Sequence, residues 1–389
     1  MTTLRQRSGS ATENAPISVY VHWPYCSHIC PYCDFNVTRD RGQAGQRALF
    51  DAILRDLNGQ AEQIGSRQLV SLFFGGGTPS LLPPEWVGEL VAEARRVFPQ
   101  STEAIEITLE ANPTDAETGR FAGFRNAGVN RLSLGVQSLD DAALKFLGRN
   151  HSAAEARRAI EVAQAVFERV SLDLIYALPG QTETDWEVEL GRAAGLGVEH
   201  ISPYQLTIEA TTAFGRAVKR GLWTPPDEDL AEAFYVTTRE TLEALGFEAY
   251  EVSNHACGKA AQSAHNVSVW RGNEYIGIGP GAHGRLMIDG RRVATTAVND
   301  LKAYAERMAE TGVGHDRETM SPLEAEEESV MLGLRMAEGV ALDRFHLLDL
   351  RARAAPLIEM GFMAADATHL RATPRGRVVL DRLLMDLLS

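Results

Sequence analysis

The sequence lacks the features that mark several large classes of protein. No apolar run approaches the roughly 18 residues of a membrane-spanning helix, and residues 1–15 are polar, without the apolar stretch of a secretory signal. Basic residues are in deficit, because 38 Lys and Arg against 52 Asp and Glu leave a net charge of −14. This balance excludes a broad basic footprint for duplex nucleic acid. We therefore expect a cytoplasmic protein with no membrane span, no nucleic-acid partner and a short flexible tail over residues 1–15.

The rest of the composition is that of a globular protein, with 44% hydrophobic and 23% charged residues. Short β-branched runs alternate with amphipathic segments through the first half, which predicts repeated βα units around a parallel sheet. Because such crossovers are right-handed, the sheet should curl into a full or partial barrel of the (β/α)6 type. The six expected strands lie near Ser18–Trp23, Leu69–Gly75, Ala104–Glu110, Arg131–Gln137, Ser171–Leu178 and His200–Ile208.

Amphipathic segments between these strands predict the helices of the barrel. Ser152 and Thr182 have the residue type and position of N-caps. Chemistry in such a barrel belongs at the carboxyl ends of the strands, where this sequence places Glu110, Gln137 and Asp173. The expected helices lie near Gln43–Ile64, Pro84–Phe98, Ala116–Ala127, Ala153–Phe167 and Glu183–Leu196.

The pattern changes in the second half of the chain. A helix of about residues 227–245 leads to a Gly-rich stretch, Gly277–Gly284, which we expect to be a loop. Consecutive helices follow, with a short β wing at Phe362–Ala372 and a final helix after Pro374. These changes divide the chain into four parts: the tail over 1–15, a barrel over 16–225, a barrel extension over 226–298 and a mostly helical, winged-helix-like domain over 299–389.

Cysteine is scarce, yet three of the four cysteines fall within eight residues: Cys26, Cys30 and Cys33. Four are too few for a disulfide framework. Three thiolates on one tight loop are ligands for a soft metal or an iron–sulfur cluster. A closed zinc site needs a fourth ligand, for which His22 and His28 are the nearby candidates, whereas a three-cysteine [4Fe–4S] cluster leaves one iron open. The fourth cysteine, Cys257, lies far from the other three in the sequence, and we expect it to be a small, buried, apolar side chain.

The spacing CxxxCxxC, with Tyr32 just before the last cysteine, resembles the motif of radical S-adenosylmethionine (SAM) enzymes. The resemblance narrows to the group that contains oxygen-independent coproporphyrinogen oxidases (HemN) and the haem chaperone HemW. It implies that the open iron binds SAM, whose reductive cleavage, fed by an electron donor, yields a 5′-deoxyadenosyl radical. The words that carry this resemblance are YVHWPYCSHICPYCDFN, FFGGGTPS, LEANP, RLSLGVQS, SLDLIYALPGQT, YQLTIE and GIGPGAHG.

The resemblance also implies a set of cofactor-binding residues. Alone, the glycines indicate a tight turn, and Arg149 with Asp173 indicates a structural salt bridge at the barrel mouth. We expect a Cβ at Gly76 or Gly77 to clash with SAM while leaving the fold in place, and Glu110 to accept hydrogen bonds from ribose hydroxyls. The set that the resemblance assigns to SAM or a second nucleotide is Tyr20, Tyr32, Gly76, Gly77, Thr78, Glu110, Gln137, Arg149 and Asp173.

Two features favour the chaperone branch over the oxidase branch. Oxidases of this group resemble CxxxCxxCxC, with a fourth cysteine two residues after the third, and here Phe35 occupies that position. Only 25 residues precede Cys26. HemW proteins also carry a haem-associated word, HNxxYW, which here keeps His265, Asn266 and Trp270 but has Val269 in place of the tyrosine. Histidine is a common axial haem ligand. Another histidine, His283, is an alternative ligand, although an ordinary loop role fits it better.

The sequence therefore predicts a protein that binds a [4Fe–4S] cluster, SAM and haem, and delivers haem to acceptor haemoproteins. The alternative is an enzyme, an oxygen-independent coproporphyrinogen III oxidase or a related radical methylase. A third interpretation is a zinc-stabilised barrel without radical chemistry. Whether SAM is cleaved, which protein receives haem and whether the chain forms a homodimer are left open.

Overall fold

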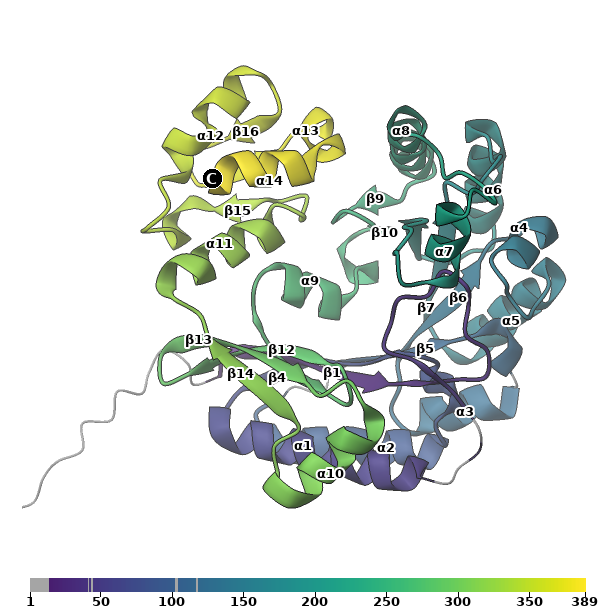
Figure 1. Ribbon diagram of the computed structural model, residues 1–389, viewed down its shortest axis with the longest axis vertical. Coiled ribbons are helices and arrows are strands. Elements are labelled where there is room, and N and C mark those ends of the chain that lie inside the picture. Colours follow the sequence, from purple (N-terminus) through teal and green to yellow (C-terminus); the bar gives the residue numbers. More distant parts are fainter. Residues whose placement is uncertain (1–13, 41, 43–44, 102–103, 117) are drawn as a thin grey trace, which may run out of the picture.

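The computed structural model describes residues 14–40, 42, 45–101, 104–116 and 118–389, so most of the expected tail lies outside it. A curved, open sheet forms the centre of the molecule, with helices along its outer face (Figure 1). The six expected strands are confirmed, and each pairs in parallel with the next. They are β1 (Pro16–Trp23), β4 (Gln68–Gly76), β5 (Glu106–Ala111), β6 (Arg131–Gln137), β7 (Arg169–Tyr176) and β8 (His200–Gln205).

The expected helices are also confirmed, with bounds shifted by a few residues; residues 43, 44 and 117 of the expected ranges are outside the described part. Capping boxes begin two of them, because Ser152 Oγ accepts from the Glu155 amide at 3.2 Å and Thr182 Oγ1 accepts from the Asp185 amide at 3.1 Å. The helices are α1 (Gln46–Ile64), α2 (Pro84–Val97), α3 (Thr118–Asn126), α5 (Ala153–Val166) and α6 (Glu183–Ala194), and two short ones not expected from the sequence are α4 (Asp141–Phe146) and α7 (Ala213–Lys219).

A seventh parallel strand, β11 (Glu274–Ile278), joins the sheet beside β1. The Gly-rich stretch is therefore a loop only over residues 279–282, and its two ends belong to strands. Gly277 packs so closely against the His283 backbone that a Cβ would collide with it, which explains glycine inside a strand here. The antiparallel strands that extend the sheet are β12 (His283–Ile288), β13 (Arg291–Ala297) and β14 (His315–Thr319) at one edge, and β10 (His255–Ala256) and β9 (Glu248–Ala249) at the other.

The C-terminal part of the chain has a hydrophobic core of its own. This second core starts well after residue 299, where the sequence pattern places the start of the C-terminal domain. Tyr304 and Met308 of α10 (Leu301–Thr311) belong to the barrel core, and the Tyr304 hydroxyl donates to Asp56 Oδ2 at 2.8 Å. A second core begins at Val330. It is built from α11 (Pro322–Gly333), β15 (Val340–Ala341), α12 (Leu350–Glu359), β16 (Met363–Ala365), β17 (His369–Ala372), α13 (Pro374–Val378) and α14 (Leu380–Leu388).

Two further segments connect the barrel to this second core. Helix α8 (Glu228–Ala244) packs on α6, and α9 (Ala264–Trp270) lies between the sheet and α11 (Figure 1). Cys257, expected to be buried, is exposed, because it falls just after the two-residue strand β10. No helix in the described ranges is both long and apolar enough to cross a bilayer.

Candidate functional site

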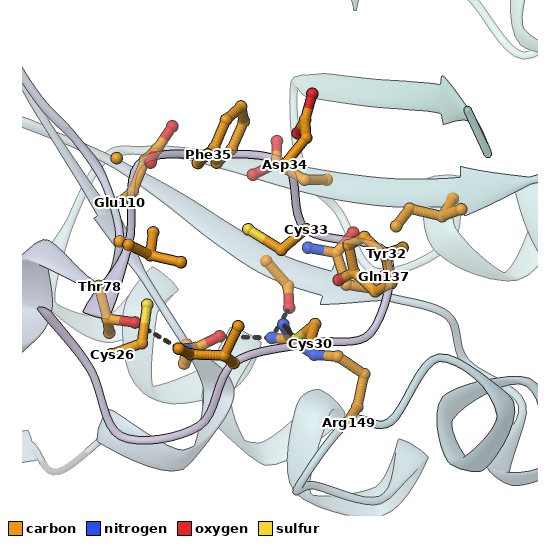
Figure 2. A pocket seen from close by; sticks show the side chains of 18 of the residues that line it. Cys26, Cys30, Tyr32, Cys33, Asp34, Phe35, Thr78, Glu110, Gln137 and Arg149 are labelled. Atoms are coloured by element: carbon orange, nitrogen blue, oxygen red, sulfur yellow. Dashed lines mark hydrogen bonds between the residues drawn. The ribbon is translucent and has the colours of Figure 1, made fainter. Parts of the chain in front are cut away.

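A cavity of about 420 Å³ opens at the carboxyl ends of the parallel strands, where the sequence places its candidate residues. The loop that carries the three cysteines forms one wall, and the ends of β4 to β8 form the floor and the other wall (Figure 2). Eleven of the predicted residues line it together: Cys26, Cys30, Tyr32, Cys33, Gly76, Gly77, Thr78, Glu110, Gln137, Arg149 and Asp173.

The cysteine loop is anchored to distant parts of the chain. The Phe214 amide of α7 donates to Pro31 O at 2.9 Å. Asn36 donates from Nδ2 to Pro280 O at 3.0 Å and to Asn299 O at 2.8 Å. Two short parallel strands, β2 (Tyr25–Cys26) and β3 (Thr38–Arg39), close its base. Sequence reasoning missed Asn36, although it lies in one of the words that carry the resemblance.

The three cysteines face the cavity as free thiols. Burial raises the pKa of Cys26, and it raises the pKa of Cys33 to about 11, so a metal that binds them has to displace protons. Within the described residues, no three His, Cys, Asp or Glu side chains stand close enough to hold a single metal ion.

Neither histidine proposed as a fourth zinc ligand completes such a site. Both ring nitrogens of His22 are engaged, Nε2 with Asn36 O at 2.8 Å and Nδ1 with the Tyr20 hydroxyl at 3.1 Å. His28 is exposed on the cysteine loop. Tyr20 itself lies below the cavity rather than in its lining, and its ring stacks on Phe73 with centroids 6.2 Å apart.

Arg149 brings a positive charge to the cysteine loop. Its Nη1 donates to Cys30 Sγ at 3.3 Å, and its Nη2 donates to Gly135 O at 2.8 Å and to Asn112 Oδ1. Asp173 is instead held by Ser133, whose Oγ lies 3.1 Å from Oδ1. The alternative of a structural salt bridge between Arg149 and Asp173 is therefore wrong, because each side chain has other partners.

The glycines at the end of β4 pack directly against β1 and the residues that follow it. A Cβ at Gly76, where φ is +104°, would lie 2.6 Å from the His22 ring. A Cβ at Gly77 would lie 2.8 Å from the carbonyl oxygens of both Trp23 and Tyr25. The expectation that a Cβ here would leave the fold in place is thus wrong, since it would collide with the chain that leads into the cysteine loop.

Two carboxyl groups share the cavity floor without a counter-charge in direct contact. Burial, followed by repulsion from Asp173, raises the pKa of Glu110 to about 8. Burial likewise raises the pKa of Asp173 to about 6. Uncompensated carboxyl groups in a cavity are suited to accept hydrogen bonds from ligand hydroxyls or to face a ligand cation.

Gln137 and Asn112 complete the floor. Gln137 has a φ of +67° at a break in the β6–β7 register, a conformation that non-glycine residues adopt mainly where a site requires it. Asn112 donates from Nδ2 to Thr78 Oγ1 at 3.2 Å and accepts from Arg149. Sequence reasoning did not single out Asn112, although the LEANP word contains it.

Comparisons with known proteins agree with this geometry. Residues 20–191 match the Radical SAM superfamily, and residues 320–379 match the HemN C-terminal domain. Heme chaperone HemW of Escherichia coli is 34% identical over 95% of this chain and 97% of its own length. The chain belongs to the radical SAM superfamily, in the group of HemN and HemW.

Other relatives of this radical SAM protein give the same assignment. HemW of Bacillus subtilis is 38% identical over 84% of the chain and 86% of its own length. The mitochondrial radical S-adenosyl methionine domain-containing protein 1 of Bos taurus is 39% identical over 96% and 87%. Coproporphyrinogen III oxidase (HemN) from Escherichia coli shares the fold, with a TM-score of 0.81, 23% identity and coverage of 97% and 91%.

The haem-associated word lies at the opposite end of the barrel from the cysteine loop. It forms α9, whose His265 is 8% exposed, bonds through Nδ1 to Ser71 Oγ at 3.0 Å and packs on the Phe73 ring. Trp270 packs against a small separate cluster that includes Tyr250 and Met336, under the guanidinium of Arg335. Neither His265, Trp270 nor Asn266 lines the cavity that holds the three cysteines.

Proposed function

We propose that this radical SAM protein is a haem chaperone of the HemW type, which binds a [4Fe–4S] cluster, SAM and haem and transfers haem to acceptor haemoproteins. The observation that carries the proposal is the three-cysteine cavity in a chain that matches a heme chaperone over 97% of that protein's length. Phe35 supports the chaperone branch, because the loop offers no fourth cysteine at that position.

Cys26, Cys30 and Cys33 would hold the cluster. The fit rests on three free thiols directed into one cavity and on Arg149, whose Nε is buried without a partner and whose Nη1 reaches Cys30. A guanidinium in this place offsets the negative charge of thiolates. A bound cluster with one open iron supplies the electron that cleaves SAM. Within this chain, Arg149 and the anchored loop hold the thiols in place and keep their charge balanced.

SAM would occupy the floor of the cavity. Glu110 lines this floor, where it would accept ribose hydrogen bonds, and its carboxyl group would face the positive charge that a sulfonium brings. Thr78, Gln137, Arg149 and Asp173 line the adjoining part of the floor, where polar groups of a nucleotide would find partners. Tyr32 packs on Phe214 and closes one side of the cavity against water.

Anaerobic reconstitution followed by separate titrations with haem and with coproporphyrinogen III tests this function. We expect brown protein with about four irons and four sulfides per chain, binding of one haem, and passage of that haem to an apo-haemoprotein. We expect no decarboxylation of coproporphyrinogen III in the presence of SAM and a reductant. Decarboxylated product would instead make the chain an oxidase, and absence of haem binding would also contradict the proposal.

The oxidase remains the second candidate function. The observation in its favour is the cavity itself, which has space above Gln137 and Asp173 and polar groups on its floor. An oxidase would need that space for its porphyrinogen substrate and for the nucleotide whose radical abstracts hydrogen from a propionate side chain. Product analysis in the experiment above separates the two candidates.

A further inference from the structure

Large apolar side chains are exposed around the mouth of the cysteine cavity. Ile29 is 41% exposed, Phe35 is 63% exposed and Tyr204 is 42% exposed, and all three line the cavity. Figure 2 shows Phe35 on the segment that follows Cys33, beside Asp34. Exposed apolar residues that gather at one opening mark a binding surface rather than ordinary surface scatter.

This mouth has two apolar walls. Ile29 and Phe35 stand on the cysteine loop, while Ile175, Tyr204 and Leu206 stand at and just beyond the ends of β7 and β8. Glu110, Gln137 and Asp173 line the same cavity at the strand ends. The mouth therefore offers apolar side chains to a flat apolar ligand beside the polar floor.

An exposed imidazole stands at the same mouth. His28 lies between two of the cysteines, is exposed and lines the cavity. Among the described residues, no hydrogen bond or ion pair engages its ring, so the ring nitrogens remain available to a ligand. Imidazole nitrogen is a common axial ligand of haem iron.

We propose that His28, Ile29, Phe35 and Tyr204, here called the rim, form the haem site, with His28 as an axial ligand of the iron and the apolar side chains against the macrocycle. This inference rests on the proposed function, because it supposes that haem is the ligand. Coordination adds one nitrogen–iron bond to ferric haem in place of a bound water, and no electron is transferred.

Charge sets the orientation of haem on the rim. Asp34 and Glu209 also line the cavity and would repel the two propionates. The propionates therefore point to solvent, and the apolar edge of the macrocycle points toward the rim. This orientation leaves an edge of the haem open to an acceptor protein, which a transfer function requires.

The haem-associated word, which forms α9, offers a poorer haem site than the rim. His265 is buried beneath the sheet, and its Nδ1 already bonds to Ser71 Oγ. A haem that used His265 would have to separate α9 from the barrel, because the amides of Ala264 and His265 are held by the buried Glu106 carboxylate. The rim needs no such opening.

The test is titration of the anaerobically reconstituted full chain with ferric haem, followed by difference absorbance in the Soret region, electron paramagnetic resonance of the ferric haem and haem off-rates. The rim variants are His28→Ala, His28→Gln and Phe35→Ala. Their matched controls are His346→Ala and Leu347→Ala, an exposed imidazole and an exposed apolar side chain on the C-terminal domain. The α9 variants are His265→Ala and Val269→Tyr. Iron and sulfide content confirms that each variant keeps its cluster.

We expect His28→Ala and His28→Gln to shift the Soret band and change the ferric haem signal and to release haem at least ten times faster, and free imidazole to restore the Soret position in His28→Ala. Phe35→Ala should release haem faster while keeping the spectrum, and the controls should match the unaltered protein. Unchanged spectra in both His28 variants, or loss of the signal in His265→Ala with tighter binding in Val269→Tyr, would overturn the rim and leave the chaperone function standing. Absence of haem binding by the unaltered protein would overturn both.

Discussion

Strand β5 carries two glutamates that point into the barrel and meet opposite surroundings. Glu106, at the amino end, is buried against Arg169 at 2.8 Å and accepts hydrogen bonds from the amides of Ala264 and His265. Glu110, four residues later, faces the cavity without a direct counter-charge. Glutamate therefore holds the amino end of the barrel together through an ion pair and hydrogen bonds. At the carboxyl end it leaves a carboxyl group facing the cavity.

The pKa values of the two carboxyl groups express this difference. Burial opposes ionisation of Glu106, but Arg131, Arg169 and the α9 amides outweigh it and hold the pKa below its usual range. At Glu110 burial and Asp173 act together and raise the pKa to about 8. A buried carboxylate that the protein neutralises is structural, whereas one that it leaves uncompensated is available to a ligand.

The largest expected effect concerns cluster assembly at the cavity end of the barrel. Replacing Cys26, Cys30 or Cys33 by Ala removes a thiolate, and no other cysteine stands in the cavity to replace it. Each variant should fail to assemble a stable cluster, whereas Cys257→Ala should assemble one normally. Iron and sulfide analysis after anaerobic reconstitution decides the matter, and a cluster-free Cys257→Ala protein would refute the ligand assignment.

The amino end of the barrel should respond in stability rather than in cofactor content. Glu106→Ala leaves Arg169 and two α9 amides without their acceptor, which should lower the free energy of unfolding by about 3–5 kcal/mol. Urea unfolding of the apoprotein measures this loss. Glu110→Ala is the matched variant on the same strand, and equal destabilisation by both substitutions would erase the distinction between the two ends.

A smaller loss of stability should follow from a single methyl group at the end of β4. Gly77→Ala places a Cβ against the carbonyls of Trp23 and Tyr25, so the unfolding free energy should fall by about 1–3 kcal/mol and the cysteine loop should loosen. Gly119→Ala, which meets nothing within 4 Å, is the control. The two variants are compared by urea unfolding and by limited proteolysis of the loop. Normal stability of Gly77→Ala would mean that the strand end tolerates displacement.

The ligand role of Glu110 should appear in SAM binding. Glu110→Gln keeps the size of the side chain but replaces one carboxyl oxygen by an amide donor, so an acceptor for ribose hydroxyls is lost and SAM binding should weaken by about 1–3 kcal/mol. Calorimetry on the reconstituted protein measures the affinity. Glu106→Gln, remote from the cavity, should bind SAM normally if it folds. Equal affinity of Glu110→Gln and the unaltered protein would place SAM elsewhere.

The same carboxyl group should make stability depend on pH. Because the folded pKa of Glu110 is raised to about 8, the folded chain holds a proton that the unfolded chain releases near 4.5. Its contribution to stability is complete below pH 4.5 and is lost as the pH rises through 8. Asp173, with a folded pKa of about 6, adds a further loss of stability at lower pH, as the pH rises through 6. Glu110→Gln should flatten the decline between pH 6 and 8 in urea unfolding of the apoprotein, and an unchanged slope would contradict the shift.

Local signals in the sequence were enough for the six parallel strands and the capped helices. Ser152 and Thr182 begin their helices through bonds to residues three positions away, so the sequence window contains the whole interaction. Glu110, Gln137 and Asp173 were expected together because parallel strands all end at the same edge, whereas the other cavity residues followed from the family resemblance. Neither inference needs knowledge of distant contacts.

What the sequence did not yield depends on long-range packing. β11 pairs with β1 across more than 250 residues, and its five residues have no pattern that names their partner. The burial of His265 follows from the way α9 covers the barrel, which no local periodicity encodes. Asn112 and Asn36 looked like ordinary loop residues until the structure placed their amides between Thr78, Arg149 and the chain near Asn299.

The bonds from Asn36 to Pro280 O and Asn299 O have a consequence for biosynthesis. A chain emerging from the ribosome displays its three cysteines early, but the segment that fixes their loop is translated only after most of the barrel. Until then the loop lacks the two bonds of Asn36, although Phe214 and the β2–β3 pair already contact it. Cluster insertion should therefore be a late event, carried out on a nearly finished polypeptide. A nascent chain truncated before residue 280 should accept iron and sulfide poorly, even with all three cysteines present.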